Sequence, residues 1–364
     1  MVKEQKTTGL SRELIIHPGN TIAEILEDRE MSQKELAIRT GVTDKHISTI
    51  VNGVKPISVA FAKKLEYALG IEAEFWINLQ ANYDREIYEF EEVNNISVEE
   101  LSVLKKLKDV LLCWGEFGWI DNEIHSDFKV LELRKLMGIS NLTDIPQLAY
   151  SASFRAQTSC KNVDPYVLFA WQRMCELLTV DIPVSESLDI DKLKSKIPEI
   201  KRLMFADLEE MKKNVEKIFA ECGIAFKIVK HFKGAPVQGF IKNSENGRLI
   251  LCMTIRNSFA DIFWFTLFHE IAHVIYGDAK VRFFDFESVS TEVEVRADKF
   301  ASNTLIRLAE YNKFLEKKDY SLDAIKAFSN KCEVKTYIVI GRLMKDGIID
   351  WGSYKDERLR YKWA

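Results

Sequence analysis

The chain has few of the features that direct a protein to a membrane or to an oxidising compartment. It begins with the polar, charged residues MVKEQKTTGLSREL, which do not resemble a signal peptide. An apolar run around residue 265 is interrupted by Asp261, His269, Glu270 and His273, which argues against a membrane span. The six cysteines are dispersed and form no Cys-x-x-Cys pair, as expected for reduced thiols in packing roles. We therefore expect a cytoplasmic protein with no membrane partner.

A strong basic charge is also lacking. The formal net charge is −4, so nothing in the overall composition indicates nucleic-acid binding, and any such function must be a local feature. An apolar content of 47% with 29% charged residues is typical of a soluble globular protein. A length of 364 residues is enough for two or three domains.

Histidine is scarce, yet two of the six histidines fall in HEIAH at residues 269–273. This motif lies in FADIFWFTLFHEIAHVIYG, which predicts a buried helix. Histidines four residues apart share one face of a helix, so His269 and His273 can bind the same metal ion. With Zn²⁺ bound there, Glu270 would point towards the open ligand position and act as the general base. The alternative is a chance match in a core helix. For the dispersed cysteines, ligation of zinc is a less favoured alternative to packing roles.

A third ligand is predicted in TEVEVRADKFASNTLI, which reads as a second helix after a short loop. Glu294 and Asp298 are four residues apart and lie on one face of that helix. We expect Glu294 to complete the ligand set, and Asp298 to hydrogen-bond the outer nitrogen of a ligand histidine. Glu292 competes with Glu294 but lies on another face from Asp298. Each acid taken alone would be interpreted as part of a solvated helix face.

These residues carry a resemblance to a known family. FWFTLFHEIAH, followed by EVRADKFA at residues 294–301, resembles the ImmA/IrrE family of bacterial zinc metallopeptidases. The resemblance extends through APVQGFI, RLILCMTIR and YIVIGRL, and departs at residues 303–307, where family members often carry a proline. It implies a zincin-like fold, a Zn²⁺ cofactor at the ligands named above and a protein substrate.

Residues 15–83 are predicted to form five short helices. Asn20 is expected to cap the first. Ser32 and Glu35 form a capping box for QKELAIRTG, which Gly41 ends, and TDKHISTI forms the next helix. The apolar residues of this pair have the spacing of a helix-turn-helix, in which the second helix lies in the major groove of DNA. These residues are Leu36, Ala37, Val42, Ile47 and Ile50.

This segment, HPGNTIAEILEDREMSQKELAIRTGVTDKHISTIVNG with GIEAEFWINLQ, resembles XRE-type helix-turn-helix domains and, more closely, HigA-type antitoxins. The resemblance implies double-stranded operator DNA as a partner. Because residues 1–70 are nearly neutral, a monomer should bind weakly, and we expect a homodimer. Gln33 is expected to meet a phosphate. The exposed positions of the reading helix should contact DNA: Thr43, Asp44, Lys45, Ser48 and Thr49. Local positive charge comes from Lys34, Arg39, Lys55, Lys63 and Lys64. A plain helical bundle is the alternative.

The remaining segments complete the expected fold, which is mainly α with a small antiparallel sheet (α+β). Residues 84–203 are predicted to be a helical linker that mediates dimerisation or domain coupling, or serves only as a scaffold. Residues 204–310 hold the metallopeptidase domain, with strands at FKIVKHF, VQGFIK and RLILCMTI. Turns are predicted at Lys233–Gly234 and Asn246–Gly247, and Asp261 is expected to cap the HEIAH helix. Residues 311–364 form a C-terminal helical segment, more a lid than a second DNA reader.

Two functions follow from the resemblances. The first is a bacterial DNA-binding regulator with a zinc-dependent ImmA/IrrE-like endopeptidase domain, which cleaves a regulatory protein such as a repressor and controls an operon. The intact Glu270 favours it. The alternative is a non-catalytic HigA-like antitoxin or transcription repressor that uses the zinc fold to bind a toxin or a signal. The HigA-like segment favours this second interpretation.

Overall fold

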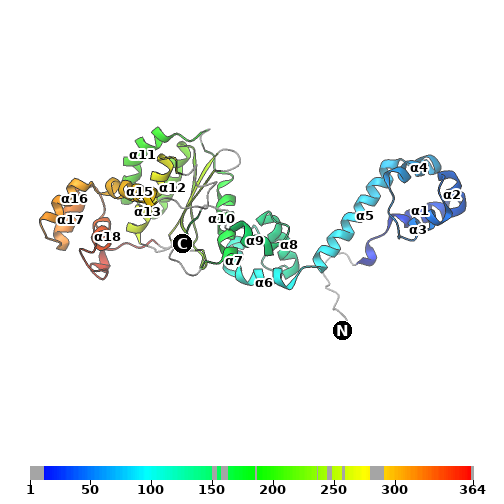
Figure 1. Cartoon of the computed structure of the whole chain (residues 1–364), viewed down its shortest axis with the longest axis horizontal. Helices are drawn as coiled ribbons and strands as arrows, with labels where there is room; N and C mark the ends of the chain where they lie inside the picture. Colours follow the sequence, from blue (N-terminus) through cyan, green and yellow to red (C-terminus); the bar gives the residue numbers. More distant parts are fainter. Residues whose placement is uncertain are drawn as a thin grey trace. The chain divides into compact units, whose positions relative to one another are not determined.

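A computed structural model describes residues 12–149, 154–156, 163–184, 187–235, 237–243, 248–255, 259–278 and 291–361. Within these residues the protein is mainly helical with one small sheet (Figure 1). Two compact units can be separated. One comprises the described residues up to Ser102 with Asp121–Leu133, and the other comprises Val103–Ile120 with the described residues from Arg134 onwards. The predicted linker, residues 84–203, contributes to both units.

The N-terminal unit is helical. It contains η1 (Arg12–Leu14), α1 (Pro18–Asp28), α2 (Gln33–Thr40), α3 (Asp44–Val51), α4 (Val59–Leu69) and α5 (Ala73–Asn94). Helices α6 (Val98–Lys106) and α8 (Ser126–Met137) each begin in this unit and end in the other. The predicted five short helices are therefore present, but the fifth continues well beyond residue 83.

The helix ends of this unit follow local chemistry. Ser32 Oγ accepts a hydrogen bond from Glu35 N at 3.1 Å, and Gly41 ends α2 in the left-handed conformation, as predicted. The prediction for α1 was wrong, because His17 rather than Asn20 is the cap, its Nδ1 accepting from Gly19 N at 2.9 Å. Pro18 at the first helical position sets this start.

The apolar spacing gives the expected packing. Leu36, Ala37, Ile47 and Ile50 are all buried in one cluster, and Val42 packs against it from the side. Helix α1 crosses the end of α3 so closely that a Cβ on Gly19 would lie 2.1 Å from the carbonyl oxygen of Ile50. Glycine at this position therefore allows the close approach of the two helices.

The second unit surrounds the sheet. Its helices before the sheet are α7 (Lys108–Glu116), η2 (Leu142–Asp144), α9 (Ile145–Ala149), α10 (Pro165–Thr179), α11 (Ile190–Arg202), η3 (Leu203–Phe205) and α12 (Leu208–Glu221). The strands are β1 (Phe154–Ala156), β2 (Ile224–Val229), β3 (Val237–Asn243) and β4 (Leu249–Thr254). They are followed by α13 (Ala260–Ile275), α15 (Thr291–Leu305), α16 (Leu308–Glu316), α17 (Leu322–Lys331), α18 (Thr336–Lys345) and η4 (Lys355–Glu357).

The sheet is mixed rather than antiparallel, which corrects the expectation from the sequence. Its strand order is β1-β3-β4-β2, with β2 parallel to β4 and both other pairs antiparallel. Every residue of β4 is buried, as befits a central strand covered on both faces. The turn at Lys233–Gly234 therefore joins strands that are not neighbours, because β4 lies between them. The predicted turn at Asn246–Gly247 lies outside the described residues.

Side chains on β3 alternate between two faces of the sheet. Phe240 meets Trp171 of α10 on one face, with ring centroids 6.0 Å apart. On the other face a Cβ on Gly239 would collide with Glu270 of α13, and Ile241 joins the apolar core around that helix. The sheet thus separates α10 from α13, and the HEIAH motif lies on the α13 side.

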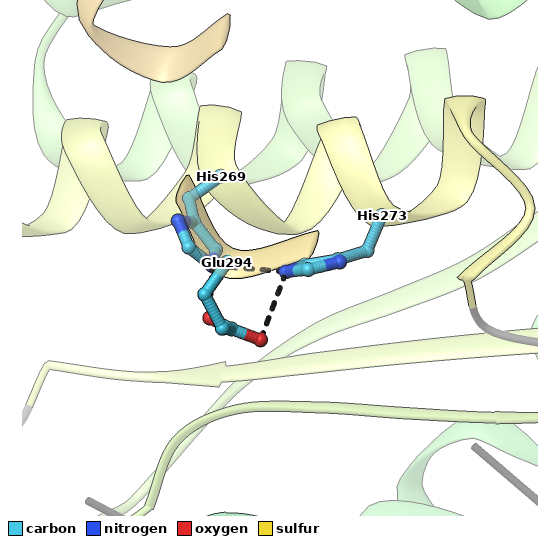
Figure 2. Close-up of side chains that lie close together, drawn as sticks. All are labelled: His269, His273 and Glu294. Carbon is cyan, nitrogen blue, oxygen red and sulfur yellow. Dashed lines mark hydrogen bonds and ion pairs between the residues drawn. The ribbon is translucent and has the colours of Figure 1, made fainter. Parts of the chain in front are cut away.

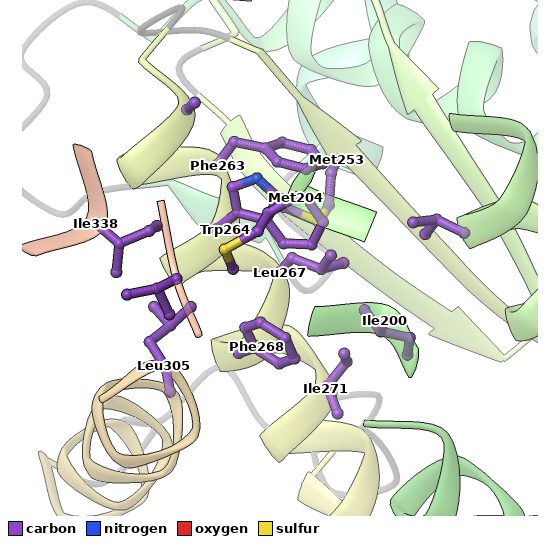
Figure 3. Close-up of a cluster of buried hydrophobic side chains, with 14 of the residues drawn as sticks. Ile200, Met204, Met253, Phe263, Trp264, Leu267, Phe268, Ile271, Leu305 and Ile338 are labelled. Atoms are coloured by element: carbon purple, nitrogen blue, oxygen red, sulfur yellow. The ribbon is translucent and has the colours of Figure 1, made fainter. Parts of the chain in front are cut away.

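Helix α13 is the centre of this core and is buried nearly all round. Phe263, Trp264, Leu267, Phe268 and Ile271 pack against other elements of the unit (Figure 3). The partners labelled in the figure come from α11, η3, β4, α15 and α18: Ile200, Met204, Met253, Leu305 and Ile338. Such an apolar helix cannot lie on a surface, so the motif it carries is held rigidly.

Asp261 does not cap α13, contrary to the prediction. Phe259 occupies the cap position, and the buried Asp261 carboxylate pairs with Arg358, whose Nη2 lies 2.9 and 3.2 Å from its two oxygens. Burial raises the pKa of Asp261 even though Arg358 acts in the opposite direction. A Cβ on Gly341 of α18 would lie 2.3 Å from this carboxylate, so glycine lets α18 approach.

Helix α18 belongs to the C-terminal segment, which was predicted to be a lid rather than a second DNA reader. Its residues Tyr337–Ile340 are buried, together with Leu343 and Met344, and the helix packs on α13. A helix buried in this way cannot enter a DNA groove. Among the described helices, none is both long and apolar enough to cross a membrane.

Candidate functional site

His269 and His273 extend from the same face of α13 towards Glu294 of α15 (Figure 2). The Nε2 atoms of the two histidines are 2.9 Å apart. One Glu294 oxygen lies 3.3 Å from His269 Nε2, and the other lies 3.7 Å from His273 Nε2. Both imidazoles are buried, whereas the Glu294 side chain is 37% exposed.

The outer nitrogen of each histidine faces a carboxylate. His269 Nδ1 is 2.6 Å from Asp298 Oδ1, and His273 Nδ1 is 3.0 Å from Asp278 Oδ2. Because an ionised carboxylate can only accept, each Nδ1 is assigned the proton and each Nε2 is left with its lone pair. The structure thus gives Asp298 the contact that was expected of it, and adds Asp278 on the second histidine.

Three hydrogen-bond acceptors, the two Nε2 atoms and the Glu294 carboxylate, therefore lie around one point. The ligand atoms of His269, His273 and Glu294 all lie within 4.8 Å of one another. Two imidazole lone pairs and a carboxylate repel each other unless a cation lies between them. The group could hold a metal ion, and two nitrogens with one carboxylate oxygen are a donor set that zinc accepts. Glu292, the competing ligand, is exposed and is not a member of the group.

The contact of Asp278 with His273 was not predicted from the sequence. Asp278 follows Gly277, whose φ of +75° turns the chain back after α13, and its carboxylate also receives Arg296 Nη2 at 2.7 Å. The Arg296 guanidinium lies 4.3 Å from the ring centroid of Tyr276. Arg296 thereby links α15 to the end of α13. The only signal in the sequence for the role of Asp278 was an acidic residue directly after a glycine.

Glu270 is the acidic residue of the HEIAH motif, and it is 1% exposed. Its side chain fills the space over Gly239 of β3, where a Cβ would lie 2.5 Å from Glu270 Oε1 and 2.7 Å from its Cδ. Glycine at 239 therefore leaves room for the carboxylate between α13 and β3. This requirement comes from the packing of α13 on β3, and it could not be predicted from the glycine in VQGF alone.

Lys345, at the end of α18, extends the arrangement outwards. Its Nζ is 3.8 Å from Asp298 Oδ2 and 4.0 Å from the ring centroid of Phe265. The expected lid segment thus supplies a cation to the outer carboxylate of His269. The loop predicted between the two helices falls at residues 279–290, outside the described residues.

In the N-terminal unit, the predicted DNA-contacting residues differ in exposure. Gln33, Thr43, Asp44 and Lys45 are exposed, whereas Ser48 and Thr49 are half-buried. Thr43 Oγ1 is engaged as the cap of α3, accepting from His46 N at 3.2 Å. Thr49 Oγ1 donates to the carbonyl of His46 at 2.8 Å, and Ser48 Oγ accepts from Asn52 Nδ2 at 3.1 Å. Local bonds therefore occupy part of the hydrogen-bonding capacity of all three hydroxyls.

The positive charge expected around α3 is partly neutralised. Arg39 pairs with Glu35 at 2.7 Å, and Lys63 pairs with Glu66. No ion pair to another described residue is made by Lys34, Lys45, Lys55 or Lys64. The free cations of this face are therefore fewer than the sequence alone suggested.

The similarities to known proteins described below lie in this N-terminal unit. Residues 22–76 match a family model described as helix-turn-helix. The N-terminal domain belongs to that family. The matched residues include helices α2 and α3, and the domain is a helix-turn-helix DNA-binding domain.

The domain is related to antidote proteins of the HigA type. The chain is 30% identical to an addiction module antidote protein of the HigA family from Coxiella burnetii, over 26% of this chain and 89% of that one, with a TM-score of 0.19. It is 34% identical to a proposed antidote protein of a plasmid maintenance system from Nostoc punctiforme PCC 73102, over 22% of this chain and 97% of that one, with a TM-score of 0.20. These relations rest on sequence identity rather than on the TM-scores.

A third relative is the virulence-associated protein A' of Dichelobacter nodosus. It is 39% identical over 69 residues, which cover 19% of this chain and 60% of that protein. The chain thus spans less than two thirds of the length of the Dichelobacter protein. None of these relations extends to a peptidase domain, so the metal group is interpreted from its own geometry.

Proposed function

We propose that this chain is a DNA-binding regulator whose second unit is a zinc-dependent endopeptidase of the ImmA/IrrE type, cleaving a regulatory protein. One observation carries the proposal. The lone pairs of His269 and His273 converge with the Glu294 carboxylate beside Glu270, a buried acid that is not part of the ligand group.

The side chains have distinct roles in this proposal. His269, His273 and Glu294 would hold the ion, and zinc supplies Lewis-acid chemistry for amide hydrolysis when it is bound. Glu270 accepts a proton from the attacking water and returns it to the leaving amine nitrogen. Its burial over Gly239 keeps the carboxylate away from bulk water.

The proposal for DNA recognition rests on α3. Lys45 is exposed near its start and is suited to a guanine or a phosphate. Asp44 and Thr43 lie beside it, and Gln33 at the start of α2 is placed to meet the backbone. Few free cations surround this surface, so we propose that two copies of the chain bind an operator together.

The peptidase is tested with Glu270→Gln. The amide keeps the size of the side chain but cannot accept the proton, so zinc, fold and DNA binding should be retained while hydrolysis is lost. Proteins that are cleaved in cells expressing the wild type, and stay intact with Glu270→Gln, identify the substrate. Glu292→Gln on the exposed face of α15 is the matched control and should behave as wild type. A cleavage pattern unchanged by Glu270→Gln would refute this role.

DNA binding is tested with the upstream region of the chain's own gene. Lys45→Ala combined with Ser48→Ala should weaken specific binding at least about tenfold, since a good base contact contributes about 1–3 kcal/mol. Lys63→Ala is the control, because Glu66 already neutralises that lysine. Undiminished binding by the double variant would show that α3 does not read the DNA.

The relation to antidote proteins favours a second candidate function. In this alternative the chain represses its own operon and binds a toxin, and the second unit serves as a binding module rather than as an enzyme. Cells lacking the gene distinguish the two functions. Full rescue by Glu270→Gln, together with copurification of a toxin encoded beside the gene, would support the alternative and exclude hydrolysis as the function.

A further inference from the structure

The second unit holds a cavity on the α10 face of the sheet, the face opposite to α13. Its volume is about 250 Å³. Lys242 of β3 lines it together with Gln172, Arg173 and Glu176 of α10, and Phe169 and Met137 supply apolar surface. None of these residues belongs to the candidate metal centre, so the cavity calls for its own explanation.

The polar lining is built around one carboxylate. Glu176 Oε2 accepts from Arg173 Nη1 at 2.8 Å, and Oε1 accepts from Lys242 Nζ and from Gln172 Nε2, the latter at 3.3 Å. Burial alone would raise the pKa of Glu176, but the hydrogen bonds from Lys242 and Arg173 outweigh it and lower the pKa. Glu176 is therefore ionised, and the two cations leave the cavity with an excess positive charge.

Gln172 is the unusual member of this lining. The residue is 9% exposed, and its Oε1 has no hydrogen-bond partner in the described structure. A buried carbonyl without a donor loses its interaction with water and gains nothing in return. Leucine or methionine would fill the same position on α10 without that loss. A glutamine here is understandable if a bound molecule donates a hydrogen bond to it.

We propose that the cavity binds a small monocarboxylate with a hydroxyl or amino group on the adjacent carbon. The carboxylate meets the excess positive charge, since Arg173 uses Nε for the Leu136 carbonyl and Nη1 for Glu176, which leaves Nη2 for a ligand. The hydroxyl or amino group donates to Gln172 Oε1. Phe169 and Met137 cover the carbon skeleton, and a cavity of about 250 Å³ is too small for a nucleotide.

Calorimetric titration of the full chain tests this site. L-Lactate and L-alanine are the probes, and propionate, which lacks the donor, is the comparison. Saturable binding of at least one probe is expected, with propionate at least about tenfold weaker because it leaves Gln172 Oε1 without a partner. Gln172→Met and Lys242→Met should each weaken the probe at least about tenfold.

Lys227→Met is the matched control. Lys227 makes a similar half-buried pair with Glu216 at 2.8 Å, but it does not line the cavity, so binding should be unchanged. Gln172→Met preserves side-chain volume and decides the matter if Lys242→Met does not fold. Absence of saturable binding by both probes would overturn the proposal and leave a water-filled cavity. Equal binding by wild type and Gln172→Met would overturn it as well. Neither result bears on the metal centre.

Discussion

Asp278→Asn provides a test of the metal centre that needs no knowledge of the substrate. Asp278 Oδ2 is 3.0 Å from His273 Nδ1, and its other oxygen receives Arg296. The carboxylate fixes the proton on Nδ1 and increases the electron density at Nε2, the atom that would bind zinc. Asparagine can still accept through its oxygen, but it is neutral and can also present its NH₂ group to the ring.

The expected loss follows from this geometry. Removal of the partner of a ligand histidine weakens metal binding about 10–100-fold. Because asparagine retains an acceptor, we expect the lower end for Asp278→Asn, about tenfold or about 1.4 kcal/mol. Asp278→Ala should approach about 100-fold. Arg296→Met should have a smaller effect than either, and none in the Asp278→Asn background, because Arg296 acts on His273 only through Asp278.

Competition with a chromogenic chelator measures the zinc dissociation constant. Asp298→Asn should show a comparable loss, since Asp298 has the same relation to His269. Asp346→Asn is the control, because Asp346 bonds Tyr311 at 2.7 Å and is not part of the group. If His273→Ala abolishes zinc binding while Asp278→Asn matches wild type within about threefold, the inferred role of Asp278 is wrong. Zinc retained by His273→Ala would remove the metal centre itself.

Three further outcomes are expected. Gly239→Ala would place a Cβ 2.5 Å from Glu270 Oε1 and displace the carboxylate, so hydrolysis should fall about 100-fold with zinc content unchanged; full activity would contradict the assigned position of the base. Burial lowers the pKa of His17, and the cap needs the neutral ring, so its stabilisation is present above about pH 6.5 and is lost as the pH falls through the lowered pKa. Urea unfolding should therefore separate wild type from His17→Ala by about 1 kcal/mol near neutral pH, and the difference should vanish in acid; a constant difference would refute the cap's titration. Arg358→Met leaves Asp261 buried without its partner and should cost about 3–5 kcal/mol in thermal unfolding, while adding Asp261→Asn should recover part of the loss; strict additivity of the two changes would show that the pair does not interact.

The parts of the site that lie within a helix turn could be predicted from the sequence. The spacing of His269 and His273, and of Glu294 and Asp298, places each pair on one helix face, and the structure brings all four side chains together. What could not be predicted depends on contacts between distant segments. Gly239 matters only because β3 passes under α13, and parallel pairing of β2 with β4 requires a crossover that no local pattern records.

Two predictions failed for other reasons: the role of Asp278 was not foreseen, and the cap of α1 was assigned to the wrong residue. Asp278 reaches His273 only because of the turn at Gly277, and a turn of that kind leaves no periodic signal. The cap of α1 could have been found, since Pro18 favours the first helical position and so points to His17. Preference for asparagine as a capping residue led instead to Asn20. Residue statistics were outweighed there by the fixed φ of a neighbouring proline.

The ligands of the candidate centre are unequally exposed, and this sets how an ion can enter or leave. His269 and His273 belong to a helix that other elements cover, whereas the Glu294 side chain is 37% exposed on α15. Exchange of the ion through the α13 side would require the core to open, at a cost comparable to unfolding the unit. Exchange past Glu294 would require only that its carboxylate release the ion and that this one half-exposed side chain change rotamer. If the group holds a metal ion, release by the Glu294 carboxylate would therefore control its exchange, and substitution of Glu294 should speed metal exchange more than it alters the fold.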